Sequence, residues 1–405
     1  MFINLIMRSP RHTLVVFRSP VTIFALSVIV AVGLIATSAS AASTNTQCRF
    51  NGEFKGKEGQ LSACIWSDVG RGKWIKFTKR NYASLSAYEK TKFLAYQEIQ
   101  KLYKSGPLFS ISHTYFISKN LPAEFQSRYV NQTERASRFY DQLFPKPVKV
   151  NAYYQTEKDE QYIKSHPVLK FDFEMFSSWF QAWRSGKNLD HNIGLAAWYR
   201  EVDGVTQGHT GVVLGSKSQL KNIRLYSEQV VAHEYFHVVQ DYYKFERDRK
   251  GYEGEDGFAA YYPPIFREGS ANTVSFGVSM QSFEDYLLFY QIFLAENIGK
   301  NQPKIFNSLT NKSKVVSTLN LIEKRSNDPD AHWASYSLGA LTFEWFIAKY
   351  GIEAFKRLVF NQKLGKTFEE NIKISADITL DELYDGAAEH VFLGFNAAKT
   401  AKSFS

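Results

Sequence analysis

The residues with the clearest potential for chemistry lie in segment 231–239, which reads V-A-H-E-Y-F-H-V-V. His233 and His237 are four positions apart, so on a helix they lie one above the other, with about 5–6 Å between Cβ atoms. Two imidazoles placed in this way can bind one Zn²⁺ at the usual N–Zn distance of about 2.0–2.1 Å. Glu234 is rotated by about 100° from His233, so it can take a proton from a water at the metal without being a ligand.

The alternative is that the two histidines are structural residues of a buried helix. Independent residue frequencies would produce H-E-x-x-H only about 0.01 times in a chain of this length, which contains nine histidines. Apolar residues flank the motif on both sides, so these three polar side chains would be costly to bury without partners. The motif therefore predicts a mononuclear site that holds one Zn²⁺ per chain.

An open zinc site of this kind needs a third protein ligand, and two acidic residues downstream could supply it. The favoured one is Glu268, in an E-G-x-A sequence that opens a new helix after a proline and an aromatic residue. The small residues Gly269 and Ala271 are predicted to let this helix pack tightly against the zinc helix. Asp256 is the weaker alternative, because its acidic, glycine-rich surroundings are typical of a solvated loop.

The H-E-x-x-H motif followed by E-G-x-A resembles the gluzincin metallopeptidases, a group that includes thermolysin-like enzymes, zinc aminopeptidases and bacterial collagenases. The H-E-Y-x-H sequence and the thirty-residue gap between His237 and Glu268 are more similar to those of the collagenase-like members. The resemblance implies that His233, His237 and Glu268 bind zinc and that Glu234 is the general base. In thermolysin-like members an acid four residues after the Glu ligand orients a ligand histidine; here the neutral Asn272 occupies that place.

The resemblance, which covers about 226–360, also implies a hydrogen-bond donor for the oxyanion that develops during hydrolysis. Tyr336 stands in a Y-x-x-G sequence similar to that of the zinc aminopeptidases, and His332, one helical turn earlier, is the rival donor. Segment 210–214 lies where gluzincins have an edge strand that pairs with the substrate backbone. Core packing of its apolar side chains is equally compatible with the sequence.

The elements that must position these residues are those of an α+β fold. We expect an N-terminal mixed-sheet subdomain, then zincin-like active-site helices, then a C-terminal helical subdomain. Ser86 and Glu89 form a capping box at the start of the first helix. The predicted strands are 111–117, 148–154, 194–199 and 210–214. The predicted helices are 87–104, 122–143, 227–243, 267–276, 281–296, 333–350, 352–361 and 380–394.

The N-terminal segment has the order of an export signal. Arg8, Arg11 and Arg18 precede or border an apolar run at 21–35, and the triplet 39–41 has the A-x-A form of a cleavage site. We expect removal of the signal after Ala41, with an uncleaved membrane anchor as the alternative. The mature protein is then expected to be secreted or periplasmic, with no stable membrane association.

The two cysteines, Cys48 and Cys64, follow this signal closely and are predicted to form a disulfide in an exported protein. Such a bond would contribute about 3 kcal/mol by the loop-entropy argument. Removing 1–41, which holds three Arg and no acid, lowers the formal net charge from +9 to +6. Because no block of Lys and Arg accompanies this modest excess, no nucleic-acid partner is expected.

The sequence thus divides into a signal peptide at 1–41, a cysteine-linked segment at 42–85, an α/β subdomain at 86–225 and a zinc-binding helical region at 226–400. The expected function is that of an exported zinc metallopeptidase acting on peptide or protein substrates. One alternative is a non-catalytic metal-binding scaffold of the same fold, for which an intact Glu234 would have no use. The other is a zinc hydrolase that cleaves a non-peptide amide.

Overall fold

The structure, a computed structural model, describes most of the chain from Phe54 onward. The described ranges are 54–56, 60–66, 72–76, 81–171, 173–187, 192–195, 200–202, 204–215, 224–248, 263–300, 303–324 and 329–403. The predicted signal peptide, Cys48 and the alternative ligand Asp256 lie outside these ranges. No described helix is both long and apolar enough to cross a membrane.

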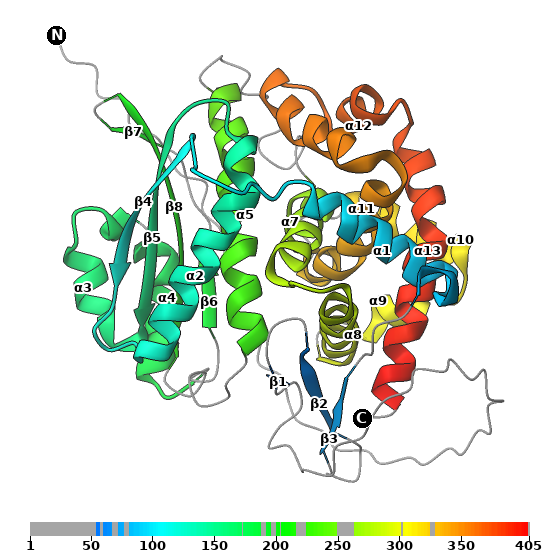
Figure 1. The fold of residues 1–405 in the computed structure, drawn as a ribbon, viewed down its shortest axis with the longest axis horizontal. Coiled ribbons are helices and arrows are strands. Elements are labelled where there is room, and N and C mark those ends of the chain that lie inside the picture. The colour runs from blue at the N-terminus through cyan, green and yellow to red at the C-terminus, as the bar shows by residue number, and fades with distance from the viewer. Residues whose placement is uncertain are drawn as a thin grey trace. The chain divides into compact units, whose positions relative to one another are not determined.

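Strands between residues 111 and 214 form a five-stranded sheet (Figure 1). The sheet is mixed, as the sequence predicts. Its strand order is β4-β5-β8-β6, and β7 also pairs with β8. Strands β4, β5 and β8 are parallel to one another, whereas β6 and β7 run antiparallel to β8. The strands are β4 (Ile111–Ile117), β5 (Val148–Thr156), β6 (Asn192–Leu195), β7 (Arg200–Val202) and β8 (Val205–Leu214). Helix α2 (Ala123–Tyr140) makes the crossover that parallel β4 and β5 require.

Strand β8 is an interior strand of this sheet, so of the two interpretations of segment 210–214 the edge strand is wrong and core packing is right. Val213 is paired with Gln155 of β5 on one side and with Ile193 of β6 on the other. The apolar side chains of this segment belong to a strand that is buried on both of its faces.

The two faces of the sheet are covered by different helices, because successive side chains of a strand point to opposite sides. Tyr154 and Val212 face helices α2 and α5 (Arg224–Asp248), where Tyr129 and Val231 complete an apolar cluster. Tyr153 and Val213 point the other way, toward helices α3 (Glu160–Ser165) and α4 (Phe173–Arg184). The predicted zinc helix, α5, is thereby fixed against the sheet.

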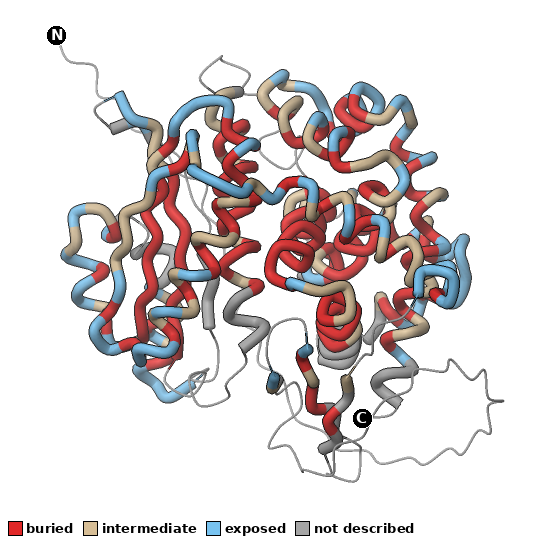
Figure 2. Tube along the Cα trace, viewed as in Figure 1, coloured by how far each residue is buried: buried red, intermediate tan, exposed pale blue. Residues whose placement is uncertain are grey.

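Helices form most of the remaining described chain and surround α7, which is buried along nearly its whole length (Figures 1 and 2). The capping box predicted for α1 is present, with Ser86 and Glu89 each bonding the backbone N–H of the other. The further α-helices are α1 (Ala87–Gln100), α7 (Pro264–Ser279), α8 (Phe283–Lys300), α9 (Pro303–Ser308), α10 (Lys312–Lys324), α11 (Pro329–Phe360), α12 (Phe368–Ala376) and α13 (Leu380–Ser403). Short 3₁₀ helices lie at Tyr82–Ser84, Asp141–Leu143, Glu157–Asp159, Leu169–Phe171 and Asn361–Leu364.

Gly269, one of the two small residues after Glu268, makes a close contact that the sequence did not predict. A Cβ atom on Gly269 would lie 2.5 Å from the backbone of Gly339 in α11, and one on Gly339 would lie 2.5 Å from the carbonyl oxygen of Ile265. Gly269 therefore lets α7 cross α11 at backbone contact. This crossing places Glu268 beside the first turns of α11, where Tyr336 lies.

The segments before α1 form a small separate sheet. Strands β1 (Phe54–Lys55), β2 (Ser62–Trp66) and β3 (Gly72–Ile75) pair antiparallel in that order. Cys64 lies on β2 and is buried against Trp74. Because Cys48 lies outside the described residues, the disulfide between the two cysteines stays a prediction.

Candidate metal centre

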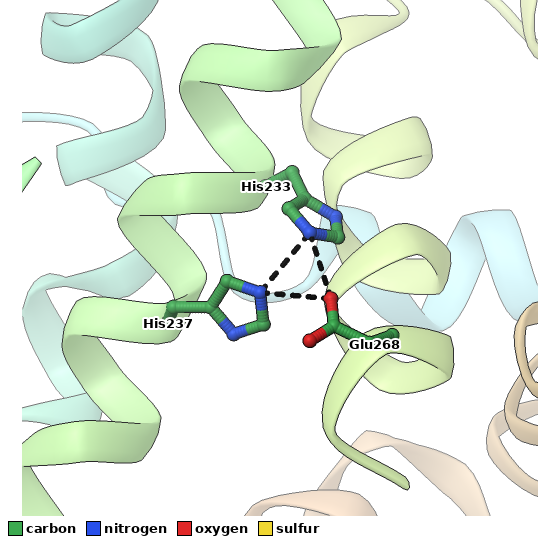
Figure 3. Close-up of side chains that lie close together, drawn as sticks. All are labelled: His233, His237 and Glu268. Atoms are coloured by element: carbon green, nitrogen blue, oxygen red, sulfur yellow. Dashed lines mark hydrogen bonds and ion pairs between the residues drawn. The ribbon is translucent and has the colours of Figure 1, made fainter. Parts of the chain in front are cut away.

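Helices α5 and α7 bring His233, His237 and Glu268 together at one buried point (Figure 3). The Nε2 atoms of the two histidines are 3.0 Å apart. Oε2 of Glu268 lies 3.3 Å from Nε2 of His233 and 3.2 Å from Nε2 of His237. The three side chains are 3–9% exposed, so the group lies close beneath the surface.

These distances fit a tetrahedral zinc site. Ligand atoms that lie 2.0–2.1 Å from zinc at tetrahedral angles are about 3.3–3.4 Å from one another, close to the observed triangle. Two imidazole nitrogens that face each other at 3.0 Å repel unless a proton or a cation lies between them. Two His nitrogens and a carboxylate oxygen also form a donor set that zinc prefers, with a fourth position left for water or substrate.

The charge state of Glu268 suits a metal ligand. Burial alone would raise the pKa of this carboxyl, but the charge of His237 and hydrogen bonds with both histidines hold it well below its ordinary value. For His237, burial would lower the pKa, whereas the carboxylate of Glu268 raises it. The carboxylate therefore stays ionised in the buried site and attracts positive charge, whether carried by a proton or by a metal.

Gln240 orients one of the histidines, and the sequence interpretation missed it. Its Oε1 accepts a hydrogen bond from Nδ1 of His237 at 2.6 Å. The amide is itself held in place, since its Nε2 donates to the carbonyl oxygen of Arg267 and to Oγ of Ser270. Nδ1 of His237 then carries the proton and Nε2 is left to bind a metal. The signal was present in the sequence, because Gln240 lies three residues after His237 and so on the same helix face.

Replacing Gln240 with Leu should weaken zinc binding about 10- to 100-fold, the usual cost of losing a residue that orients a metal ligand. Competition with a chromophoric chelator measures this affinity. Gln229→Leu is the matched control, because Gln229 is buried on the same helix and bonds Asn272 and Ser275 rather than a ligand. Equal losses of zinc affinity in the two variants would contradict the role given to Gln240.

Asn272 does not contact a ligand histidine in the way that the family pattern suggested. Its Oδ1 accepts a hydrogen bond from Nε2 of Gln229 at 3.0 Å, and its Nδ2 donates to the carbonyl oxygen of Tyr336 at 2.9 Å. Nδ1 of His233 has no hydrogen-bond partner among the described residues. Because an amide can both accept and donate hydrogen bonds, Asn272 bonds to α5 and to α11 at once and links α7 to both helices.

Glu234 lies between the two histidines in sequence but is less buried than either of them. Burial raises the pKa of its carboxyl, the neighbouring histidines His233 and His237 lower it, and Glu268 raises it. Among the described residues, the group that could hold a metal consists of His233, His237 and Glu268 and does not include Glu234, whose role as a base stays a prediction.

Tyr336 and His332 both lie at the metal centre. The Tyr336 ring stacks on that of His233, with 5.9 Å between centroids and 18° between planes. Burial raises the pKa of the Tyr336 hydroxyl, and the carboxylates of Glu268 and Glu234 and a hydrogen bond with Glu268 raise it further. Burial lowers the pKa of His332, against the effect of Glu268. The hydroxyl of Tyr336 therefore keeps its proton and can donate a hydrogen bond at this site.

The opposite face of α5 is anchored by contacts that the sequence did not reveal. The hydroxyl of Tyr235 lies 2.8 Å from Nε2 of His113 on β4, and the hydroxyl of Tyr140 donates to the carbonyl oxygen of Ala232. Tyr235 lies within the H-E-x-x-H motif, so the helix is held from the sheet side at the level of its metal-binding residues.

Comparison with known proteins agrees with this chemistry. No curated protein and no solved structure matches the chain. Residues 195–371, fewer than half of the chain, match the model of a family described as "Putative zinc dependent peptidase (DUF5700)". The match includes His233, Glu234, His237, Glu268 and Tyr336, so the part of the chain that resembles a zinc-dependent peptidase family is the part that holds the candidate metal centre.

Proposed function

We propose that this chain is an exported, gluzincin-type zinc metallopeptidase. The observation that carries the proposal is the buried triangle of two imidazole nitrogens and one carboxylate oxygen, with sides of 3.0–3.3 Å. His233, His237 and Glu268 would hold one zinc ion. The match to a zinc-dependent peptidase family supports peptides or proteins as substrates. Export rests on the N-terminal sequence alone.

The chemistry divides between the metal and the side chains around it. When bound, zinc acts as a Lewis acid that polarises the scissile carbonyl and lowers the pKa of water. Glu234 accepts the proton of the attacking water and passes it to the leaving amine. The hydroxyl of Tyr336 donates a hydrogen bond to the oxyanion of the tetrahedral intermediate, with His332 as the alternative donor.

Removal and return of the metal tests this function. Purified protein should contain about one zinc per chain, as expected for a mononuclear site. A chelator should abolish cleavage of casein, gelatin or a peptide library, and one equivalent of Zn²⁺ should restore it. The intact mass of protein recovered from the export compartment reports in the same experiment whether residues 1–41 have been removed.

Two other results would replace the proposal. Zinc-loaded protein that cleaves no peptide in a broad library would be a metal-binding scaffold. Zinc-loaded protein that cleaves small non-peptide amides and leaves peptides intact would be an amide hydrolase of another substrate class. A chain that binds no transition metal after reloading with zinc would contradict the proposed site itself.

A further inference from the structure

An exposed tryptophan lies next to the candidate metal centre. Trp333 is in the first turns of α11 and is 52% exposed. Its ring stacks on Tyr336, with 5.4 Å between centroids and 29° between planes. Tyr336 in turn stacks on the ligand His233 at 5.9 Å. Three rings therefore lead from the metal ligand to the molecular surface.

This run of rings is held rigidly. His332 meets Trp333 edge-on at 5.8 Å and Tyr336 edge-on at 5.6 Å, in the T-shaped geometry that aromatic pairs favour. The backbone below is fixed as well, because Asn272 donates to the carbonyl oxygen of Tyr336. Trp333 thus has a defined orientation before any ligand arrives, and preorganisation of this kind reduces the cost of binding.

The distance from the metal limits what Trp333 can contact in a substrate. Two ring-to-ring steps separate it from His233, and an extended peptide advances about 3.3–3.6 Å per residue. A peptide with its scissile bond at the metal would therefore bring a side chain within about three residues of that bond onto the Trp333 ring.

We propose that Trp333 is a specificity-determining residue, forming the wall of a subsite that takes an aromatic or large apolar side chain of the peptide substrate. Such a side chain would stack on Trp333 and remove its exposed face from water. One methylene group more or less in an apolar pocket changes the specificity of an enzyme by about 10- to 200-fold, so contacts with a whole aromatic ring should reach at least the lower end of this range. This inference rests on the proposed peptidase function and adds the substrate class to it.

A set of alanine-glycine peptides, each with a single Phe moved one position at a time, tests the subsite directly. Mass spectrometry of the products should show that the cleaved bond follows the Phe at a fixed distance. Peptides with Phe should have a kcat/KM at least about 10-fold above those with Ala at that place. Trp333→Ala should abolish the preference, whereas Trp333→Phe should keep most of it. If the cleaved bond did not move with the position of Phe, the proposed subsite would be wrong, but the peptidase function would still be supported.

Binding gives a second readout that does not depend on turnover. Zinc-loaded Glu234→Gln protein, titrated calorimetrically with the Phe and Ala peptides, should bind the Phe peptide at least about 10-fold more tightly. Adding Trp333→Ala should remove the difference at unchanged zinc content, whereas adding Phe109→Ala, which removes an exposed ring before β4, should preserve it. Equal affinity for the two peptides would overturn the subsite, even for a protein that cleaves neither.

Discussion

Glu234→Gln should lower the rate of peptide hydrolysis by at least about 10²-fold, the lower end of the contribution of a general base, and leave zinc content and folding unchanged. The amide keeps the shape of the side chain but cannot accept a proton from water. Glu234 is not part of the ligand triangle, so metal affinity should not depend on its charge as it does on Glu268. Steady-state kinetics, elemental analysis and circular dichroism of the same preparation measure the three quantities.

Glu246→Gln is the matched control for this experiment. It makes the same change on the same helix, twelve residues and therefore about 18 Å further along its axis. Its kinetics should equal those of the wild type. If the Glu234 variant cleaved peptides as fast as the wild type, the assigned mechanism would be wrong. If instead it lost its zinc, Glu234 would be acting in the structure of the site.

The local part of the metal centre could be read from the sequence because helix geometry alone determines it. Side chains four positions apart meet on any helix, so His233 and His237 could be paired before the fold was known. The helix that opens near Glu268 is likewise signalled by the proline before it. The structure places Glu268 beside both histidines and does not describe Asp256.

The parts that the sequence could not decide depend on contacts between segments distant in sequence. Segment 210–214 has the apolar composition of a strand, but only its pairing with both β5 and β6 shows that it is interior. A glycine at position 269 indicates that another helix approaches closely, but it does not identify that helix. In the structure the helix is α11, which approaches with Gly339. The prediction of separate helices at 333–350 and 352–361 was right in its boundary, because Gly351 breaks α11 with a φ of +79°.

A second polar cluster lies apart from the metal ligands, buried among the helices of the fold. Nζ of Lys92 lies 2.9 and 2.8 Å from the two carboxylate oxygens of Glu344, and both side chains are at most 2% exposed. Nε2 of His390 and the hydroxyl of Tyr286 also bond this carboxylate. The ammonium lies 3.1 Å from the centroid of the Tyr290 ring. The cluster joins α1, α8, α11 and α13 around one carboxylate.

Both members of the central pair are ionised at neutral pH. Burial lowers the pKa of Lys92 to about 8, against the opposing effect of Glu344, so the ammonium is still charged at pH 7. Burial would raise the pKa of Glu344, but Lys92 and His390 hold it below its ordinary value. Each charge is therefore compensated mainly by the other, and loss of one would leave the other buried alone.

Glu344→Gln should consequently lower the free energy of unfolding by about 3–5 kcal/mol, the usual cost of leaving one member of a buried ion pair without its partner. Chemical denaturation measures this loss. The double variant Lys92→Met/Glu344→Gln should recover much of it, because no buried charge then remains. The matched control is Asp385→Asn, which breaks the exposed pair between Lys312 and Asp385 and should cost less than about 1 kcal/mol. A double variant no more stable than Glu344→Gln would show that the hydrogen bonds to Tyr286 and His390, rather than the charge of Lys92, make this carboxylate necessary to the fold.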